Sequence, residues 1–156
     1  MRIASTGLAE QLGPDSISAI YATYNFANAL TDAGRLDEAL ATYLDLEQRL
    51  ERTDSIGPKM LIDVELVLAD ILAWQGRVDE AIDKNELALA KRRAFYGDDD
   101  PNTINTLFVL GSRCMAVERI EEATSYFEEA VERADRVLGP KRPTRSRWSR
   151  TSEPAV

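Results

Sequence analysis

The sequence of 156 residues contains no histidine and one cysteine, Cys114. Without histidine it lacks Ser-His-Asp and Cys-His catalysis, HExxH metal sites and histidine proton transfer. A single cysteine excludes a disulfide framework and a cysteine-based zinc site. No P-loop, GxSxG or dinucleotide motif occurs. No apolar run approaches the roughly 18 residues of a membrane span. The N-terminal residues lack the apolar stretch of a signal peptide. These absences predict a soluble, cytoplasmic, non-enzymatic protein with no catalytic, cofactor-binding or metal-binding residues and no cofactor.

Acidic residues outnumber basic ones by 27 to 19, and the cations are unevenly placed. Residues 141–156 hold five cations and one acid, which leaves 14 basic and 26 acidic side chains in residues 1–140. A net charge of −12 repels phosphate backbones, so we expect no nucleic acid as a partner of this part. We expect no membrane partner either, because no apolar run is long enough to span a bilayer. Residues 139–156 are basic and aperiodic, and they predict a disordered tail.

One short pattern recurs every 42 residues. Gly-Arg-Leu-Asp-Glu-Ala at 34–39 is followed by Gly-Arg-Val-Asp-Glu-Ala at 76–81 and by Glu-Arg-Ile-Glu-Glu-Ala at 118–123. A fixed period of about 20–50 residues is typical of repeat proteins. The period predicts three repeats, at 13–54, 55–96 and 97–138. Residues 1–12 align with the second half of a repeat and predict a partial repeat that consists of a second helix only.

Each repeat is expected to form two helices. Apolar residues at helical spacing, such as Leu68, Ala69 and Leu72, predict a first helix of about 17 residues. Gly34 and Gly76 are suited to end it, because glycine accepts the left-handed backbone found there, and acidic pairs suit the start of the second helix. Small residues at equivalent positions predict that the two helices approach closely. They are Ala27, Ala69 and Gly111 in the first helices and Ala39, Ala81 and Ala123 in the second.

Over residues 13–140 the pattern resembles the tetratricopeptide repeat. The resemblance rests on the small residue in the first helix, the Gly-Arg-x-x-Glu-Ala turn, and the aromatic and alanine that follow. The period of 42 and the linker Tyr-Gly-Asp-Asp-Asp-Pro-Asn-Thr at 96–103 are similar to the kinesin light chain type of repeat. The resemblance implies an all-α fold, a right-handed α-α superhelix (solenoid) of helix-turn-helix repeats. Two positions depart from the pattern: Asn85 replaces the aromatic of the second repeat, and Glu118 replaces the turn glycine of the third.

In tetratricopeptide arrays the first helices line a concave groove that binds a peptide or protein segment. The resemblance therefore implies a protein-protein interaction scaffold, whose groove would present Tyr21, Tyr24, Asn28, Asp63, Leu66, Asp70, Trp74, Asn105, Phe108, Ser112 and Met115. Asp63 and Asp70 are seven residues apart on one helix face, which favours a basic peptide. The competing interpretation is that several of these residues only pack between repeats.

Two other functions fit the same sequence. A solenoid needs polar caps at its ends, and no amphipathic helix follows the third repeat, so self-association through open repeat ends would make a structural solenoid. The chain would alternatively be the sensor fragment of a larger signalling or regulatory protein.

The acids at 98–100 lack the alternation and closing glutamate of a calcium loop, so we expect a linker in which Asp100 caps a helix. Cys114 is expected in the core.

Overall fold

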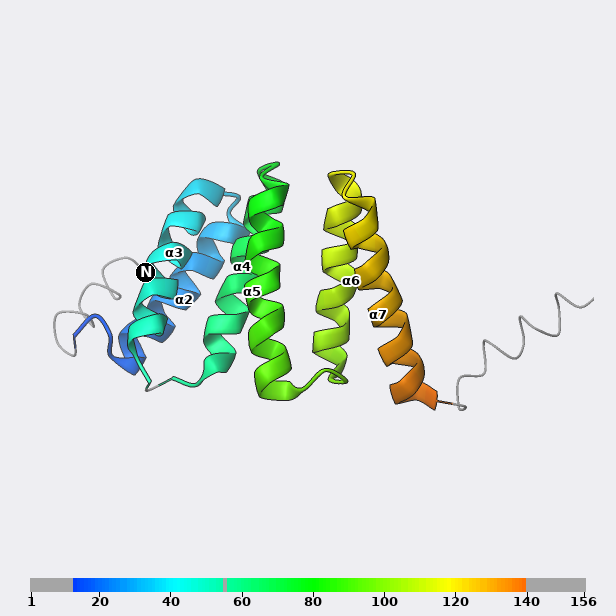
Figure 1. The fold of residues 1–156 in the computed structure, drawn as a ribbon. Coiled ribbons are helices and arrows are strands. Elements are labelled where there is room, and N and C mark those ends of the chain that lie inside the picture. The colour runs from blue at the N-terminus through cyan, green and yellow to red at the C-terminus, as the bar shows by residue number, and fades with distance from the viewer. Residues whose placement is uncertain (1–12, 55, 140–156) are drawn as a thin grey trace, which may run out of the picture. The chain divides into compact units, whose positions relative to one another are not determined.

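A computed structural model describes residues 13–54 and 56–139 of the chain. They form six helices, and no strand occurs within these ranges. The helices are α2 (Ile17–Asp32), α3 (Leu36–Arg52), α4 (Pro58–Trp74), α5 (Val78–Tyr96), α6 (Pro101–Ala116) and α7 (Ile120–Leu138). Short turns join them in pairs, α2 with α3, α4 with α5 and α6 with α7 (Figure 1). The predicted partial repeat at 1–12 and the predicted tail from 140 onward lie outside the described residues.

The chain divides into two compact units, Met1–Lys91 and Arg92–Val156. The first unit contains α2, α3, α4 and most of α5, and the second contains the end of α5 with α6 and α7. The packing of each unit is described by itself. Below, α2, α4 and α6 are called the first helices and α3, α5 and α7 the second helices.

The turn of each helix pair is closed by one arginine and one glutamate. In the first turn Arg35 donates from Nε and Nη2 to the two carboxylate oxygens of Glu38, at 2.7 and 2.5 Å. The second and third turns repeat this bidentate pair with other residues, Arg77 with Glu80 and Arg119 with Glu122. These bonds lower the pKa of the Glu80 and Glu122 carboxyls. The recurring Arg-x-x-Glu in the sequence is therefore a local clasp at the start of each second helix.

A left-handed residue precedes each clasp. Gly34 and Gly76 adopt φ of 75° and 80°, as the sequence predicts. In the third turn Glu118 takes the same role with φ of 60°. A side chain in this region costs roughly 1 kcal/mol relative to glycine, so the departure at Glu118 keeps the turn but strains it.

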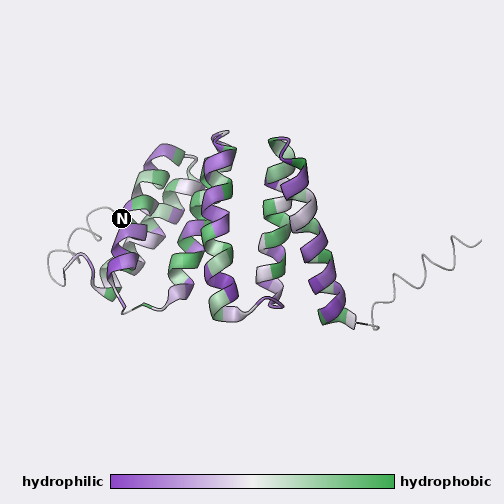
Figure 2. Ribbon diagram, in the orientation of Figure 1, coloured by the Kyte–Doolittle hydropathy of each residue, from purple (hydrophilic) through white to green (hydrophobic). Residues whose placement is uncertain are grey.

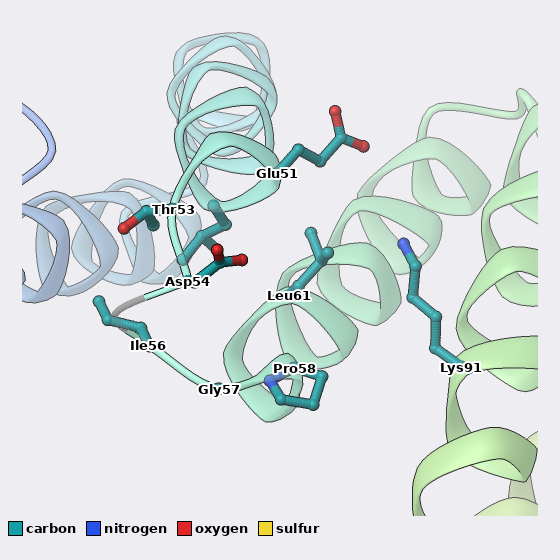
Figure 3. A pocket seen from close by; sticks show the side chains of 9 residues that line it. Glu51, Thr53, Asp54, Ile56, Gly57, Pro58, Leu61 and Lys91 are labelled. Carbon is teal, nitrogen blue, oxygen red and sulfur yellow. The ribbon is translucent and has the colours of Figure 1, made fainter.

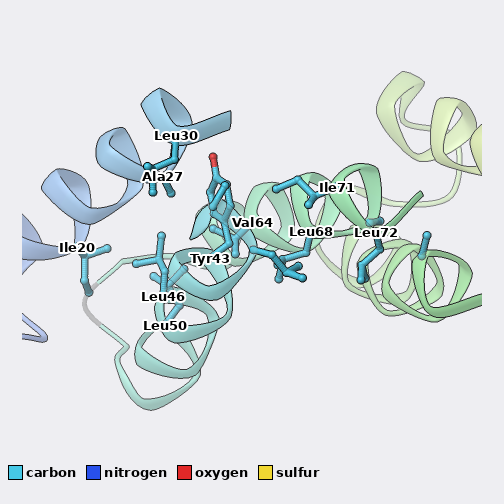
Figure 4. Close-up of a cluster of buried hydrophobic side chains, with 14 residues drawn as sticks. Ile20, Ala27, Leu30, Tyr43, Leu46, Leu50, Val64, Leu68, Ile71 and Leu72 are labelled. Carbon is cyan, nitrogen blue, oxygen red and sulfur yellow. The ribbon is translucent and has the colours of Figure 1, made fainter. Parts of the chain in front are cut away.

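The core of the first unit centres on Tyr43 of α3. Its side chain is fully buried, its ring meets the ring of Tyr24 edge-on, and its hydroxyl donates to Oδ1 of Asn28. Figure 4 shows the apolar side chains of α2 and α4 on either side of α3. They include Ile20, Ala27 and Leu30 of α2 and Val64, Leu68, Ile71 and Leu72 of α4. Apolar residues at spacings of three and four place these side chains on one face of each helix.

The second unit depends on a close approach of α6 and α7. Gly111 of α6 is buried, and a Cβ atom built on it would lie 2.7 Å from Cε1 of Phe127 on α7. The aromatic ring thus occupies the space that an alanine would need. Cys114 is buried one turn further along α6, as predicted. Figure 2 shows α7 as the more hydrophilic of these two helices.

The acidic linker before α6 is held by arginines. Asp100 caps α6 as predicted, since its side chain accepts from the backbone N–H of Asn102 at 2.9 Å, and Pro101 is the first residue of the helix. Asp98 and Asp99 lie 3.7 and 3.2 Å from the guanidinium of Arg133 on α7. Within residues 13–54 and 56–139 no group of His, Cys, Asp or Glu side chains is arranged to hold a metal ion.

Candidate functional site

The most exposed aromatic residues of the first unit lie on its first helices. Tyr21 of α2 and Trp74 of α4 expose 49% and 63% of their surface. The opposite faces of the same helices carry the buried core residues, so these two rings are not needed to hold the helices together. Among the predicted groove residues of this unit, Tyr21 and Trp74 offer the largest apolar area to a partner.

Two predicted groove residues of α2 serve the packing of α2 on α3 instead. Tyr24 is half-buried with its ring against Tyr43, and the side-chain oxygen of Asn28 accepts the Tyr43 hydroxyl. Burial raises the pKa of Tyr43 to about 12, so its hydroxyl stays a proton donor to Asn28. Tyr24 and Asn28 thus pack within the first repeat, and their place in a groove stays a prediction.

The predicted acidic residues of α4 already have intramolecular partners. Asp63 accepts from Nζ of Lys59 at 2.6 Å, one turn earlier on the same helix. Asp70 is half-buried and also has an interaction within the protein. Leu66 lies between them, half-buried. The acids are therefore available to a basic peptide only in competition with these contacts, and the basic partner stays a prediction.

In the second unit the four predicted groove residues are all exposed and all lie on α6. Asn105, Phe108, Ser112 and Met115 follow one another at intervals of three or four residues, which places them along one side of the helix. The Ser112 hydroxyl donates to the backbone oxygen of Phe108, and the Phe108 ring contacts the ring of Phe127. Phe108 and Met115 are the apolar part of this surface.

Sequence reasoning missed a buried charge cluster in the first unit. Glu65 of α4 is fully buried, and Nζ of Lys91 on α5 donates to its Oε1. Glu47 of α3 is nearly buried and accepts from Lys84 of α5 at 2.5 Å. Burial raises the pKa of the Glu65 carboxyl, and the Lys91 ammonium acts against this shift. The periodicity gave no sign of these pairs, because the residues equivalent to Glu65 in the other repeats are Thr23 and Leu107.

A pocket of about 430 Å³ opens beside this cluster, where α3 ends and α4 begins. Figure 3 shows Leu61 and Pro58 of α4 facing it, with the Lys91 side chain reaching in from α5. Glu51 and Asp54 are among its lining residues, so its walls are only partly apolar and its charges are mixed. Lys91 is already bonded to Glu65, so a ligand would have to compete with Glu65 for its ammonium group.

A comparison against protein families agrees with the helix pairs and turn clasps described above. The family model of the tetratricopeptide repeat matches residues 61–136. Residues 61–136 are therefore similar to the tetratricopeptide repeat, a class of repeat that generally mediates protein interactions as a scaffold. No curated protein sequence is significantly similar.

Solved structures with a similar fold include a putative kinesin light chain. BtubC (BKLC) from P. vanneervenii shares 21% identity at a TM-score of 0.66, over 87% of this chain and 55% of that one. A putative kinesin light chain with nearly identical TPR-like repeats from Podosopora anserina shares 18% identity at a TM-score of 0.70, over 86% of this chain and 64% of that one. These matches confirm the predicted all-α solenoid of helix-turn-helix repeats. The chain spans roughly half to two thirds of the length of these structures.

Within residues 13–54 and 56–139 no helix is long and apolar enough to cross a membrane.

Proposed function

We propose that this protein is an interaction scaffold that binds a peptide segment of a partner protein on its first helices, the groove surface that the tetratricopeptide resemblance implies. The observation that carries the proposal is the exposure of large apolar side chains on these helices, opposite their buried faces. Those side chains are Tyr21 and Trp74 in the first unit and Phe108 and Met115 in the second. Aromatic residues supply large contact areas and dominate the binding energy of many protein interfaces.

A basic segment is the partner chemistry that the charge distribution favours. The net charge of −12 in residues 1–140 attracts cations over long range and speeds the encounter with a cationic peptide. Asp63 and Asp70 place two of these carboxylates on the same helix as Trp74. A Lys or Arg side chain that displaces Lys59 from Asp63 would exchange one ion pair for another, so the apolar contacts have to supply most of the affinity.

The test is a binding selection from a random peptide library with the full chain, followed by affinity measurements on the best peptide. Tyr21→Ala and Trp74→Ala remove the proposed contacts. Leu87→Ala is the matched control, since Leu87 is as exposed as Tyr21, at 49%, but lies on the second helix α5. Truncating an aromatic hot spot costs about 2 kcal/mol, so we expect each test variant to weaken binding about 30-fold. Leu87→Ala should leave the affinity unchanged.

Equal losses in the test and control variants, or a library that yields no binder, would contradict the proposal. The preference for a basic peptide is tested separately, by the dependence of the affinity on salt. A basic peptide should bind more tightly at low salt, because surface attraction is screened as salt is added. An affinity independent of salt would refute the basic partner while leaving the scaffold function intact.

A further inference from the structure

The helix α7 carries an apolar strip with an acidic border, beside the place where the Phe127 ring packs against α6. Phe127 and Val131 form the strip, and the acids around them are Glu128, Glu132 and Asp135. Together with Thr124 these residues line a shallow depression of about 580 Å³ with a mostly apolar surface. They are called the open α7 face below.

The repeat pattern shows that this type of face is normally covered. The residues of the first repeat equivalent to Phe127 and Val131 are Tyr43 and Glu47 of α3, 84 positions earlier. Both are buried on a helix that packs against α4. Val131, by contrast, exposes 48% of its surface. The open α7 face is therefore a stacking face of the repeat without a neighbour among the described residues.

The sequence that follows α7 has the complementary chemistry. Residues 140–156 carry Lys141, Arg142, Arg145, Arg147 and Arg150 against a single acid, and they contain Trp148. The helix α7 itself carries six acids and two arginines. Apolar contact inside a border of opposite charges is the arrangement that favours specific docking of a short segment.

The chain after α7 is long enough for Trp148 to reach Phe127. Phe127 lies 12 residues before Gly139, which is about 18 Å along a helix. Nine extended residues from Gly139 to Trp148 span about 30 Å. Gly139 ends the helix with a positive φ of 53°, so the chain leaves the helix axis at this point.

A second copy of the chain is a poorer occupant of the same face. Stacking two copies would bring together two chains of net charge −8 each, and like charges oppose such association. The basic segment instead neutralises part of the acidic border. We infer that residues 140–156 dock in cis on the open α7 face, with Trp148 against Phe127 and Val131 and the arginines beside the bordering carboxylates.

Tryptophan fluorescence of the full chain tests this docking. Trp74→Phe leaves Trp148 as the only tryptophan, so the emission reports on residues 140–156 alone. In the docked state the emission lies at shorter wavelength and acrylamide quenches it less than it quenches free tryptophan. Val131→Gln in this background should lower the docking equilibrium constant about tenfold, the effect of withdrawing one valine from an apolar contact. Salt at about 1 M, where the Debye length falls to about 3 Å, should also release the segment.

Val137→Gln is the matched control, because Val137 is as exposed as Val131, at 48%, but does not line the depression. It should leave emission and quenching unchanged. Emission typical of a fully solvated tryptophan in the parent chain would overturn the inference, and so would equal effects of Val131→Gln and Val137→Gln. A blue shift that grows with protein concentration would also overturn it, since the segment would then dock on a second copy.

Discussion

Replacing Gly111 by alanine tests the close approach of α6 and α7. The new methyl group would lie 2.7 to 2.8 Å from three ring carbons of Phe127, whereas ordinary contacts begin at 3.4 Å. The ring must therefore move by several tenths of an ångström. Overpacking of this kind costs about 1–3 kcal/mol. Alanine in a helix interior is favoured over glycine by about 1 kcal/mol, so the net loss of unfolding free energy should be about 0–2 kcal/mol.

A double-mutant cycle separates these two opposing contributions. In a Phe127→Leu background the aromatic ring is gone, and Gly111→Ala should then stabilise the protein by about 0.5–1 kcal/mol. The change of sign corresponds to a coupling energy of about 1–3 kcal/mol between the two positions. Urea unfolding followed by circular dichroism measures all four chains.

Ser112→Ala is the control on the same helix, because Ser112 is exposed, and it should change the stability by no more than about 0.5 kcal/mol. A coupling energy within about 0.5 kcal/mol of zero would refute the packing argument. It would mean that the Phe127 ring yields to the methyl group without cost.

Four further substitutions test other parts of the structure by thermal or urea unfolding. Glu118→Gly relieves the left-handed backbone and should stabilise by up to about 1 kcal/mol; a destabilised variant would show that the turn is unstrained. Ala81→Leu overpacks a fully buried position and should cost about 1–3 kcal/mol, whereas Glu80→Ala removes only an exposed ion pair with Arg77 and should lower the melting temperature far less; equal effects would refute the placement. Tyr43→Phe removes the hydroxyl bonded to Asn28 and should cost about 1 kcal/mol.

A fifth substitution, Glu65→Gln, should change how stability depends on pH. The raised pKa of Glu65 means that the folded protein holds this proton more tightly than the unfolded chain. The contribution of this proton to the free energy of unfolding is complete below the pKa of the unfolded chain, about 4.3, and is lost as the pH rises through the folded pKa. The parent chain should therefore lose stability across this window relative to Glu65→Gln, and parallel pH profiles would show that Glu65 is not desolvated.

The sequence predicts the helices and turns well because these depend on local spacing. Gly34 and Gly76 lie where the helix ends require a left-handed residue, and Asp100 caps the helix it precedes. Cys114 and the small residues at equivalent positions are buried as expected. The turn glycines and the cap are decided by residues within a few positions of one another, and the helical spacing predicts which face is buried.

The site is less predictable because it depends on contacts between helices. Tyr24 and Asn28 lie on the expected first helix, but Tyr43, 15 residues beyond Asn28, engages both. Lys59 could have been recognised as the partner of Asp63 from its spacing of four residues. The pairing of Glu65 with Lys91 could not, because no spacing rule relates residues 26 positions apart on different helices.

The buried pairs of the first unit have a consequence for the order of the hairpins along the chain. Glu47 of the first hairpin finds its cation in Lys84 of the second, and the third hairpin has Tyr126 at that equivalent position. A rearranged chain in which the third hairpin followed the first would leave the Glu47 carboxylate sheltered from water without its counterion, which is costly. The hairpins share one sequence pattern, but Lys84 prevents the third hairpin from replacing the second beside the first.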